Sequence, residues 1–146
     1  MNNEVLFQLV GAIATLGWLC IIIASFLPAT HIRRSRLLLI GGRTIPLLLA
    51  AIYLALLLSS VGSAPADGNF MTLAGVATLF SVPGLLLAGW VHYLAFDLFI
   101  GRWIVDDADA LGIKPLLRLP FLLLTFWLGP IGLLSWFILR ALRKNQ

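Results

Sequence analysis

The stretch from Gly89 to Trp103 concentrates aromatic and ionisable side chains within an otherwise apolar sequence. Two of its residues, His92 and Asp97, stand where a membrane helix would ordinarily carry leucine or isoleucine. Ionisable groups at such depth are energetically costly, so a functional role is the default hypothesis for both. The chemistry open to a carboxyl and an imidazole group is proton exchange, hydrogen bonding or ion pairing.

Helical periodicity places these two groups on different faces. At about 100° per residue, Trp90, Tyr93 and Asp97 share one stripe, whereas His92 lies roughly 140° around from Asp97. The two residues therefore do not form a side-by-side pair, although neighbouring helices can complete one cavity between them. The structural alternative for Asp97 is a buried anchor paired with an arginine, and candidate partners are Arg43, Arg102 and Arg118. The alternative for His92 is a hydrogen bond between helices or a position at the membrane interface.

The composition predicts an integral membrane protein. The 146 residues are 61% hydrophobic and 11% charged, whereas soluble domains carry about 25% charged residues. The net charge of +4 comes from basic residues at the edges of apolar segments, where lipid headgroups lie, so we do not expect nucleic acid as a partner. A lone Cys20 excludes a cysteine-based zinc site, and two histidines on different segments disfavour a histidine-ligated metal, so no metal is expected within one chain.

Hydropathy predicts one all-α membrane domain over residues 1–146, a bundle of four transmembrane helices. Each span needs about 20 apolar residues. The expected spans cover about 5–27, 37–60, 82–104 and 116–142, preceded in the third case by a short lead-in helix at about 70–81. Four spans place both termini on one side of the membrane.

Several residues are expected to bend the predicted spans or to form the loops between them. The Gly129-Pro130 pair should kink the fourth span, and residues 106–118 are expected to form a polar loop. Residues 29–36 are expected to form a basic loop facing lipid headgroups. Arg43, near the start of the second span, can extend back toward that loop or point inward as a partner for Asp97 or a polar substrate group.

The second half of the chain resembles a known family. The motif is Trp-Val-His-Tyr-Leu-Ala-Phe-Asp-Leu-Phe-Ile-Gly-Arg-Trp over residues 90–103, followed by Asp106, Gly112-Ile113, Leu124-Thr-Phe and Gly129-Pro-Ile-Gly. These residues resemble the plant abscisic-acid-deficient-four-like family, small four-span membrane proteins required for converting violaxanthin to neoxanthin in plastids, with many bacterial relatives. The resemblance implies a multi-pass protein of a bacterial inner membrane, or of a plastid membrane if the source is a plant.

The resemblance also implies a reaction. Violaxanthin becomes neoxanthin by intramolecular isomerisation: an epoxide opens and a neighbouring proton leaves to give an allene, which requires no redox cofactor. An acid and a base are needed in a dry apolar slot. By this resemblance Asp97 is the candidate acid and His92 the base, or the reverse, with Arg43 or Arg102 as an electrostatic partner. The expected substrate-binding residues are Trp90, Tyr93, Phe96, Trp103, Thr125 and Trp127.

Two classes of function remain open. The first is a cofactor-independent carotenoid isomerase that acts on a xanthophyll or another isoprenoid lipid. The alternative is a non-catalytic carotenoid-binding or lipid-binding protein, or an accessory subunit of another enzyme, in which the aromatic residues belong to packing or to the lipid belt. A transporter ranks third, because the chain is small and shows no inverted halves. Small residues at Gly11, Gly41, Gly42 and Gly129 favour close helix contacts, including those of a homo-oligomer.

Overall fold

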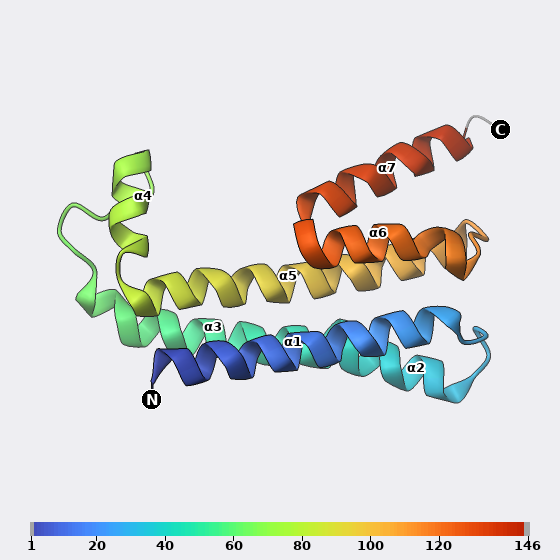
Figure 1. The fold of residues 1–146 in the computed structure, drawn as a ribbon, viewed down its shortest axis with the longest axis horizontal. Helices are drawn as coiled ribbons and strands as arrows, with labels where there is room; N and C mark the ends of the chain where they lie inside the picture. Colours follow the sequence, from blue (N-terminus) through green and yellow to red (C-terminus); the bar gives the residue numbers. More distant parts are fainter. Residues whose placement is uncertain (1, 145–146) are drawn as a thin grey trace.

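The computed structural model describes residues 2–144, and all regular secondary structure within that range is helical. Three helical segments are long and apolar enough to cross a membrane: Asn3–Phe26, Ile32–Ser63 and Pro83–Ala110. They run alongside one another along the longest axis of the molecule (Figure 1). An all-helical membrane architecture is therefore supported, whereas the expected count of four spans is not confirmed.

The core forms where these three segments meet. Helix α1 (Asn3–Phe26) and the third segment, α5 (Pro83–Ala110), contribute fully buried side chains such as Val10, Ile21 and Leu98. At the crossing of α1 and α5, a Cβ added at Gly101 would lie 2.5 Å from the Trp18 ring. Glycine at this position therefore lets the indole pack directly against the α5 backbone.

The second segment is helical throughout but not uniform. It comprises α2 (Ile32–Leu39), the π-helical turn η1 (Ile40–Thr44), α3 (Ile45–Ser60) and the short 3-10 turn η2 (Val61–Ser63). Pro46 has no N–H to donate to the carbonyl group four residues earlier, which accounts for the widened turn before α3. Most of the basic stretch expected to be a loop is helical, because His31 Nδ1 accepts a hydrogen bond from the Arg33 N–H at 3.1 Å and caps α2.

The expected lead-in helix corresponds to α4 (Leu73–Phe80), which begins where the Thr72 hydroxyl accepts a hydrogen bond from the Gly75 N–H at 3.0 Å. Helix α5 then starts at Pro83 and continues to Ala110, six residues past the expected end at 104. The acidic residues expected in a loop, including Asp106 and Asp109, are consequently on a helix. Their ion pairs with arginines keep them there.

The segment expected to form one kinked span over 116–142 is instead a helical hairpin. Helix α6 (Pro115–Leu128) and helix α7 (Pro130–Lys144) have 14 and 15 residues, fewer than the roughly 20 needed to span a bilayer. Gly129 between them has a φ of +32°, which favours glycine, and Pro130 lacks the N–H that would continue α6. Figure 1 shows α6 folding back along α5 and α7 reversing again.

Close backbone packing holds this hairpin together. A Cβ added at Gly132 would lie 2.2 Å from the Thr125 hydroxyl oxygen and 2.3 Å from the Thr125 backbone nitrogen. We expect Gly132→Ala to lower the free energy of unfolding in detergent micelles by about 1–3 kcal/mol, as overpacking does. Gly11→Ala, at a site with nothing within 4 Å, is the matched control and should change stability by less than about 1 kcal/mol. Equal losses in both variants would argue against the hairpin contact.

Candidate functional site

His92 lies in an apolar groove of about 340 Å³ formed by α3, α4, α5 and the connection between α3 and α4. We call this the His92 groove. Its lining consists of Tyr53, Leu57, Val61, Ala64, Phe70, Leu79, Phe80, Leu85, Ala88, Gly89 and His92. Among these, only His92 and Tyr53 carry a polar side chain that can donate or accept a proton. The imidazole ring packs 4.6 Å from Phe96 and 5.7 Å from Tyr53, measured between ring centroids. The groove therefore offers one imidazole and one phenol in an otherwise apolar setting.

Asp97 lies elsewhere on α5 and faces the α6–α7 turn. Its side chain is buried, and a Cβ added at Gly129 would lie 2.6 Å from its Oδ1 atom. Among residues 2–144, its buried Oδ2 atom has no hydrogen-bond partner, although the Tyr93 phenol one helical turn earlier is close enough to interact. The structure therefore places this carboxyl group against the hairpin and outside the lining of the His92 groove.

The expected arginine partners of Asp97 are engaged in other contacts or face another cavity. Arg102 pairs with Asp106, with its Nε 2.7 Å from Oδ2, and Arg118 pairs with Asp109. Arg43 is exposed at the π-helical turn. Arg43 and Arg102 both line a larger cleft of about 780 Å³ between the second segment and the C-terminal half of α5. The structure thus brings together the two candidate arginines but does not join them to Asp97 or His92.

The six expected substrate-binding residues are distributed over several faces. Trp90 stacks on Tyr93 with a centroid distance of 5.5 Å and lies 5.9 Å from Phe7 of α1. Trp103 instead stacks on Phe137 of α7 at 5.3 Å. These aromatic residues therefore do not form one continuous wall.

The remaining three members differ in their surroundings. Phe96 contacts His92, beside the groove. Thr125 is buried, and its hydroxyl donates a hydrogen bond to the Phe121 carbonyl oxygen at 2.7 Å. This hydroxyl is therefore bound to the backbone of its own helix, α6. Trp127 is 74% exposed. Of the six, Phe96 is the one in direct ring contact with His92.

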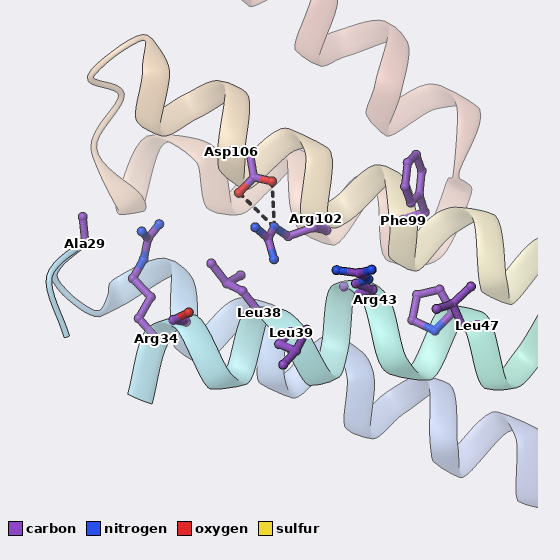
Figure 2. A pocket seen from close by; sticks show the side chains of 12 residues that line it. Ala29, Arg34, Leu38, Leu39, Arg43, Leu47, Phe99, Arg102 and Asp106 are labelled. Carbon is purple, nitrogen blue, oxygen red and sulfur yellow. Dashed lines mark hydrogen bonds and ion pairs between the residues drawn. The ribbon is translucent and has the colours of Figure 1, made fainter. Parts of the chain in front are cut away.

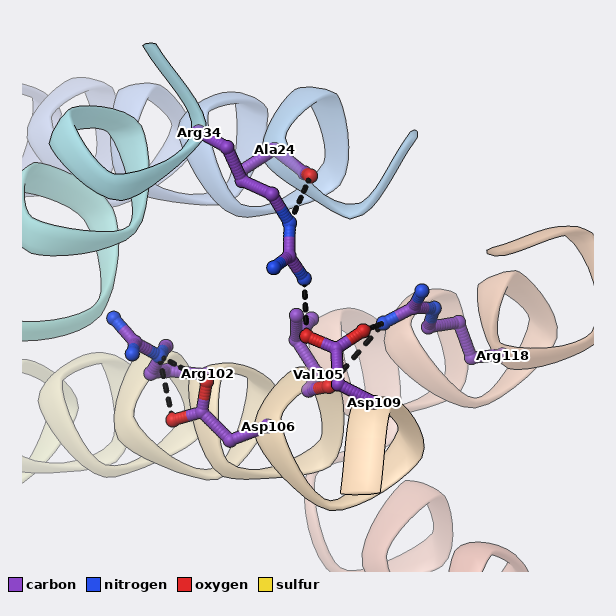
Figure 3. Close-up of polar contacts among 7 residues, drawn as sticks. All are labelled: Ala24, Arg34, Arg102, Val105, Asp106, Asp109 and Arg118. Atoms are coloured by element: carbon purple, nitrogen blue, oxygen red, sulfur yellow. Dashed lines mark hydrogen bonds and ion pairs between the residues drawn. The ribbon is translucent and has the colours of Figure 1, made fainter. Parts of the chain in front are cut away.

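Sequence reasoning missed a polar network that joins four helices. The Asp109 cluster consists of Arg34 on α2, Asp109 on α5 and Arg118 on α6 (Figure 3). Arg118 Nη1 donates to Asp109 Oδ1 at 2.7 Å, and Arg34 Nε donates to the Ala24 carbonyl of α1 at 3.1 Å. Both arginines are buried. The sequence signal was an acidic run, 106–109, in a chain whose basic run, 33–36, could face it.

Asp107 extends this network to α7. Its Oδ2 accepts a hydrogen bond from Trp136 Nε1 at 2.9 Å and lies 3.2 Å from Arg140 Nε. Within the described residues, no three His, Cys, Asp or Glu side chains gather where they could hold a metal ion. The carboxylates at the end of α5 therefore have partners on α2, α6 and α7, which identifies this region as a structural junction.

Comparison with known proteins agrees with the resemblance carried by residues 90–103. A family model described as ABA DEFICIENT 4-like matches residues 5–136, most of the chain. Protein ABA DEFICIENT 4, chloroplastic, of Arabidopsis thaliana is 32% identical over 74 residues, which cover 51% of this chain and 32% of that protein. The match thus spans about a third of the length of this curated relative. No solved structure matches the chain.

Proposed function

We propose, from the premise that this chain belongs to the ABA DEFICIENT 4-like family, that it binds a carotenoid-type isoprenoid in the membrane and isomerises an epoxide on its end ring. The reaction implied by the resemblance is of the violaxanthin-to-neoxanthin type. The observation that carries the proposal is the His92 groove, where an imidazole is set among apolar and aromatic side chains. Its volume lies near the lower end of the range for small-molecule sites, about 300–1,000 Å³.

The chemistry requires two proton transfers, one to the epoxide oxygen on the end ring and one from the chain carbon attached to that ring. The epoxide carbon–oxygen bond breaks and the oxygen gains a proton, while the carbon beside the ring loses a proton to complete the allene. Because one proton is gained and one is lost, a single imidazole can deliver the first proton and accept the second. His92 can therefore serve as acid and base in turn, with the Tyr53 phenol as the nearest second group in the groove.

This proposal changes the roles expected for the other candidates. Asp97 faces the α6–α7 turn, and Arg43 and Arg102 line a different cleft, so we assign none of them a proton-transfer role in the His92 groove. The apolar lining would hold the end ring of the carotenoid. It would also limit the access of water to the cation-like intermediate that forms when the epoxide opens. A substrate dissolved in the bilayer could enter from the side, because His92 and Phe96 are exposed on the surface of the helices.

A second candidate function is non-catalytic binding of a carotenoid or related lipid. The specific observation in its favour is that His92 and Asp97 lie on different faces of α5, so the expected acid–base pair is not assembled. Such a protein would retain unmodified pigment. Substitutions at His92 would then change binding or stability without changing any product.

The two functions can be separated in bacteria engineered to accumulate violaxanthin or zeaxanthin, which lacks the epoxide. Isomerisation predicts a new pigment with the mass of violaxanthin in the first strain and unchanged pigment in the second. Gly89→Leu should reduce both product and bound pigment, because a Cβ at Gly89 already lies 3.0 Å from the Phe80 ring and a larger side chain would fill the groove. Unmodified violaxanthin co-purifying with the wild type would favour the binding function, and absence of any pigment would contradict both.

A further inference from the structure

The cleft lined by Arg43 and Arg102 combines positive charge with an apolar surface. We call it the arginine cleft. Figure 2 shows its lining side chains between the second helical segment and α5. The lining residues are Ala29, Arg34, Ser35, Leu38, Leu39, Gly42, Arg43, Pro46, Leu47, Phe99, Arg102 and Asp106. No residue of the His92 groove belongs to this lining, so the two cavities can be tested independently.

The charges of the arginine cleft are only partly compensated. Arg34 pairs with Asp109, which lies outside the lining, and Arg102 uses its Nε to bind both oxygens of Asp106 at 2.8 and 2.7 Å. Arg43 is exposed and has no ion-pair partner among residues 2–144. One positive charge therefore remains uncompensated in a cleft whose other two arginines are held in place.

Local backbone structure supports this arrangement of arginines. Arg43 belongs to the π-helical turn Ile40–Thr44, a type of turn that is frequent at functional sites. The preceding Gly42 lies directly against α5, since a Cβ there would be 2.5 Å from Arg102 Cγ. Glycine at this position brings the Arg43 turn next to the Arg102 side chain. The two guanidinium-bearing residues thus share one cleft because of a backbone contact.

The apolar part of the cleft continues onto the surface that would face lipid. Leu39, Leu47 and Phe99 line it and are 49%, 62% and 58% exposed, respectively. An inorganic anion would make no favourable contact with this apolar surface, whereas the hydrocarbon chain of a lipid would cover it. Arginine is well suited to phosphate because its guanidinium group presents several donors in one plane. The cleft therefore combines donors for a headgroup with a surface for a hydrocarbon chain.

We propose that the arginine cleft binds an anionic phospholipid, with the headgroup phosphate at Arg43 and Arg102 and a chain along Leu47 and Phe99. The position suits such a ligand, because the cleft lies toward the end of the bundle that carries the α1–α2 turn and its basic residues (Figure 1). Basic residues near the ends of membrane-spanning helices meet lipid headgroups. This site is distinct from the epoxide chemistry proposed for the His92 groove.

The test uses the full chain in a neutral detergent, to which phosphatidylglycerol or zwitterionic phosphatidylcholine is added, with bound lipid counted by native mass spectrometry. Wild type should retain phosphatidylglycerol in preference to phosphatidylcholine. Arg43→Gln should weaken that retention about tenfold, as expected for loss of a charge-assisted hydrogen bond. Arg33→Gln removes the same charge from an exposed α2 residue outside the cleft and should stay within about twofold of wild type.

A second variant is expected to increase the retention of phosphatidylglycerol instead of lowering it. Asp106→Asn removes the carboxylate that occupies Arg102 and should strengthen phosphatidylglycerol retention. Unfolding without added lipid confirms that each variant is folded. Equal effects of Arg43→Gln and Arg33→Gln, or no preference for the anionic lipid, would overturn the proposal. If inorganic phosphate alone stabilises wild type but not Arg43→Gln, and phosphatidylglycerol is not retained, the cleft takes a soluble phosphate and the lipid assignment is wrong.

Discussion

Replacing Asp109 with asparagine is expected to lower the free energy of unfolding by about 3 kcal/mol, because it removes the shared partner of two buried cations. Arg34 and Arg118 are 7% and 4% exposed, and both bind the Asp109 carboxylate. Without that carboxylate, both guanidinium groups are left uncompensated where α2, α5 and α6 meet. Unfolding of the purified protein in mixed micelles, followed by tryptophan fluorescence, measures the loss.

The matched control is Asp106→Asn, three residues earlier on the same helix. Its partner Arg102 is one helical turn away, and the Asp106 side chain is 49% exposed. Exposed pairs of this kind contribute less than about 1 kcal/mol. Similar losses in the two variants would mean that the Asp109 cluster does not join the helices as described.

Replacing His92 with phenylalanine is expected to reduce the isomerisation rate at least about 100-fold, the lower end of general acid–base contributions. A phenyl ring keeps the packing against Tyr53 and Phe96 but has no group that exchanges a proton. The amount of pigment bound by the purified variant should therefore stay close to that of the wild type. The rate of product formation at saturating pigment is the quantity to compare.

His31→Asn provides the control for this experiment. His31 is the other histidine of the chain and caps α2 through Nδ1, and asparagine is among the preferred capping residues. We expect this variant to keep the wild-type rate. A His92→Phe protein with wild-type rate would remove His92 from the chemistry, and a variant without bound pigment would make His92 a binding residue.

The three long helical segments could be predicted from length and hydropathy, because each contains a long apolar stretch. The end of α5 could not, because its last turns carry Asp106, Asp107 and Asp109. From the sequence alone, a complete break of the helix at Gly129 could not be distinguished from a kink within one helix. Both use the same Gly-Pro pair, and the outcome depends on a positive φ and on α7 packing closely against Thr125. The acidic residues near 106–109 resembled a loop because three of the arginines that pair with them, Arg34, Arg118 and Arg140, come from other helices.

The relation between His92 and Asp97 was partly predictable as well. Their spacing on one helix predicts different faces, and the structure places one in the groove and the other against the α6–α7 turn. The partners of the arginines were not predictable. Arg34 and Asp109 are separated by 75 residues, and the pairing is decided by how α2 packs near α5. Local periodicity carries no information about such contacts.

The most direct test of the proposed function is to incubate the purified wild-type protein with violaxanthin in micelles and to separate the extracted pigments by chromatography with mass detection. Isomerisation predicts a new pigment of unchanged mass that carries an allene and a tertiary hydroxyl group, formed without any added oxidant or reductant. Recovery of unaltered violaxanthin from protein that has bound it at a fixed ratio would contradict the isomerase and leave a carotenoid-binding protein.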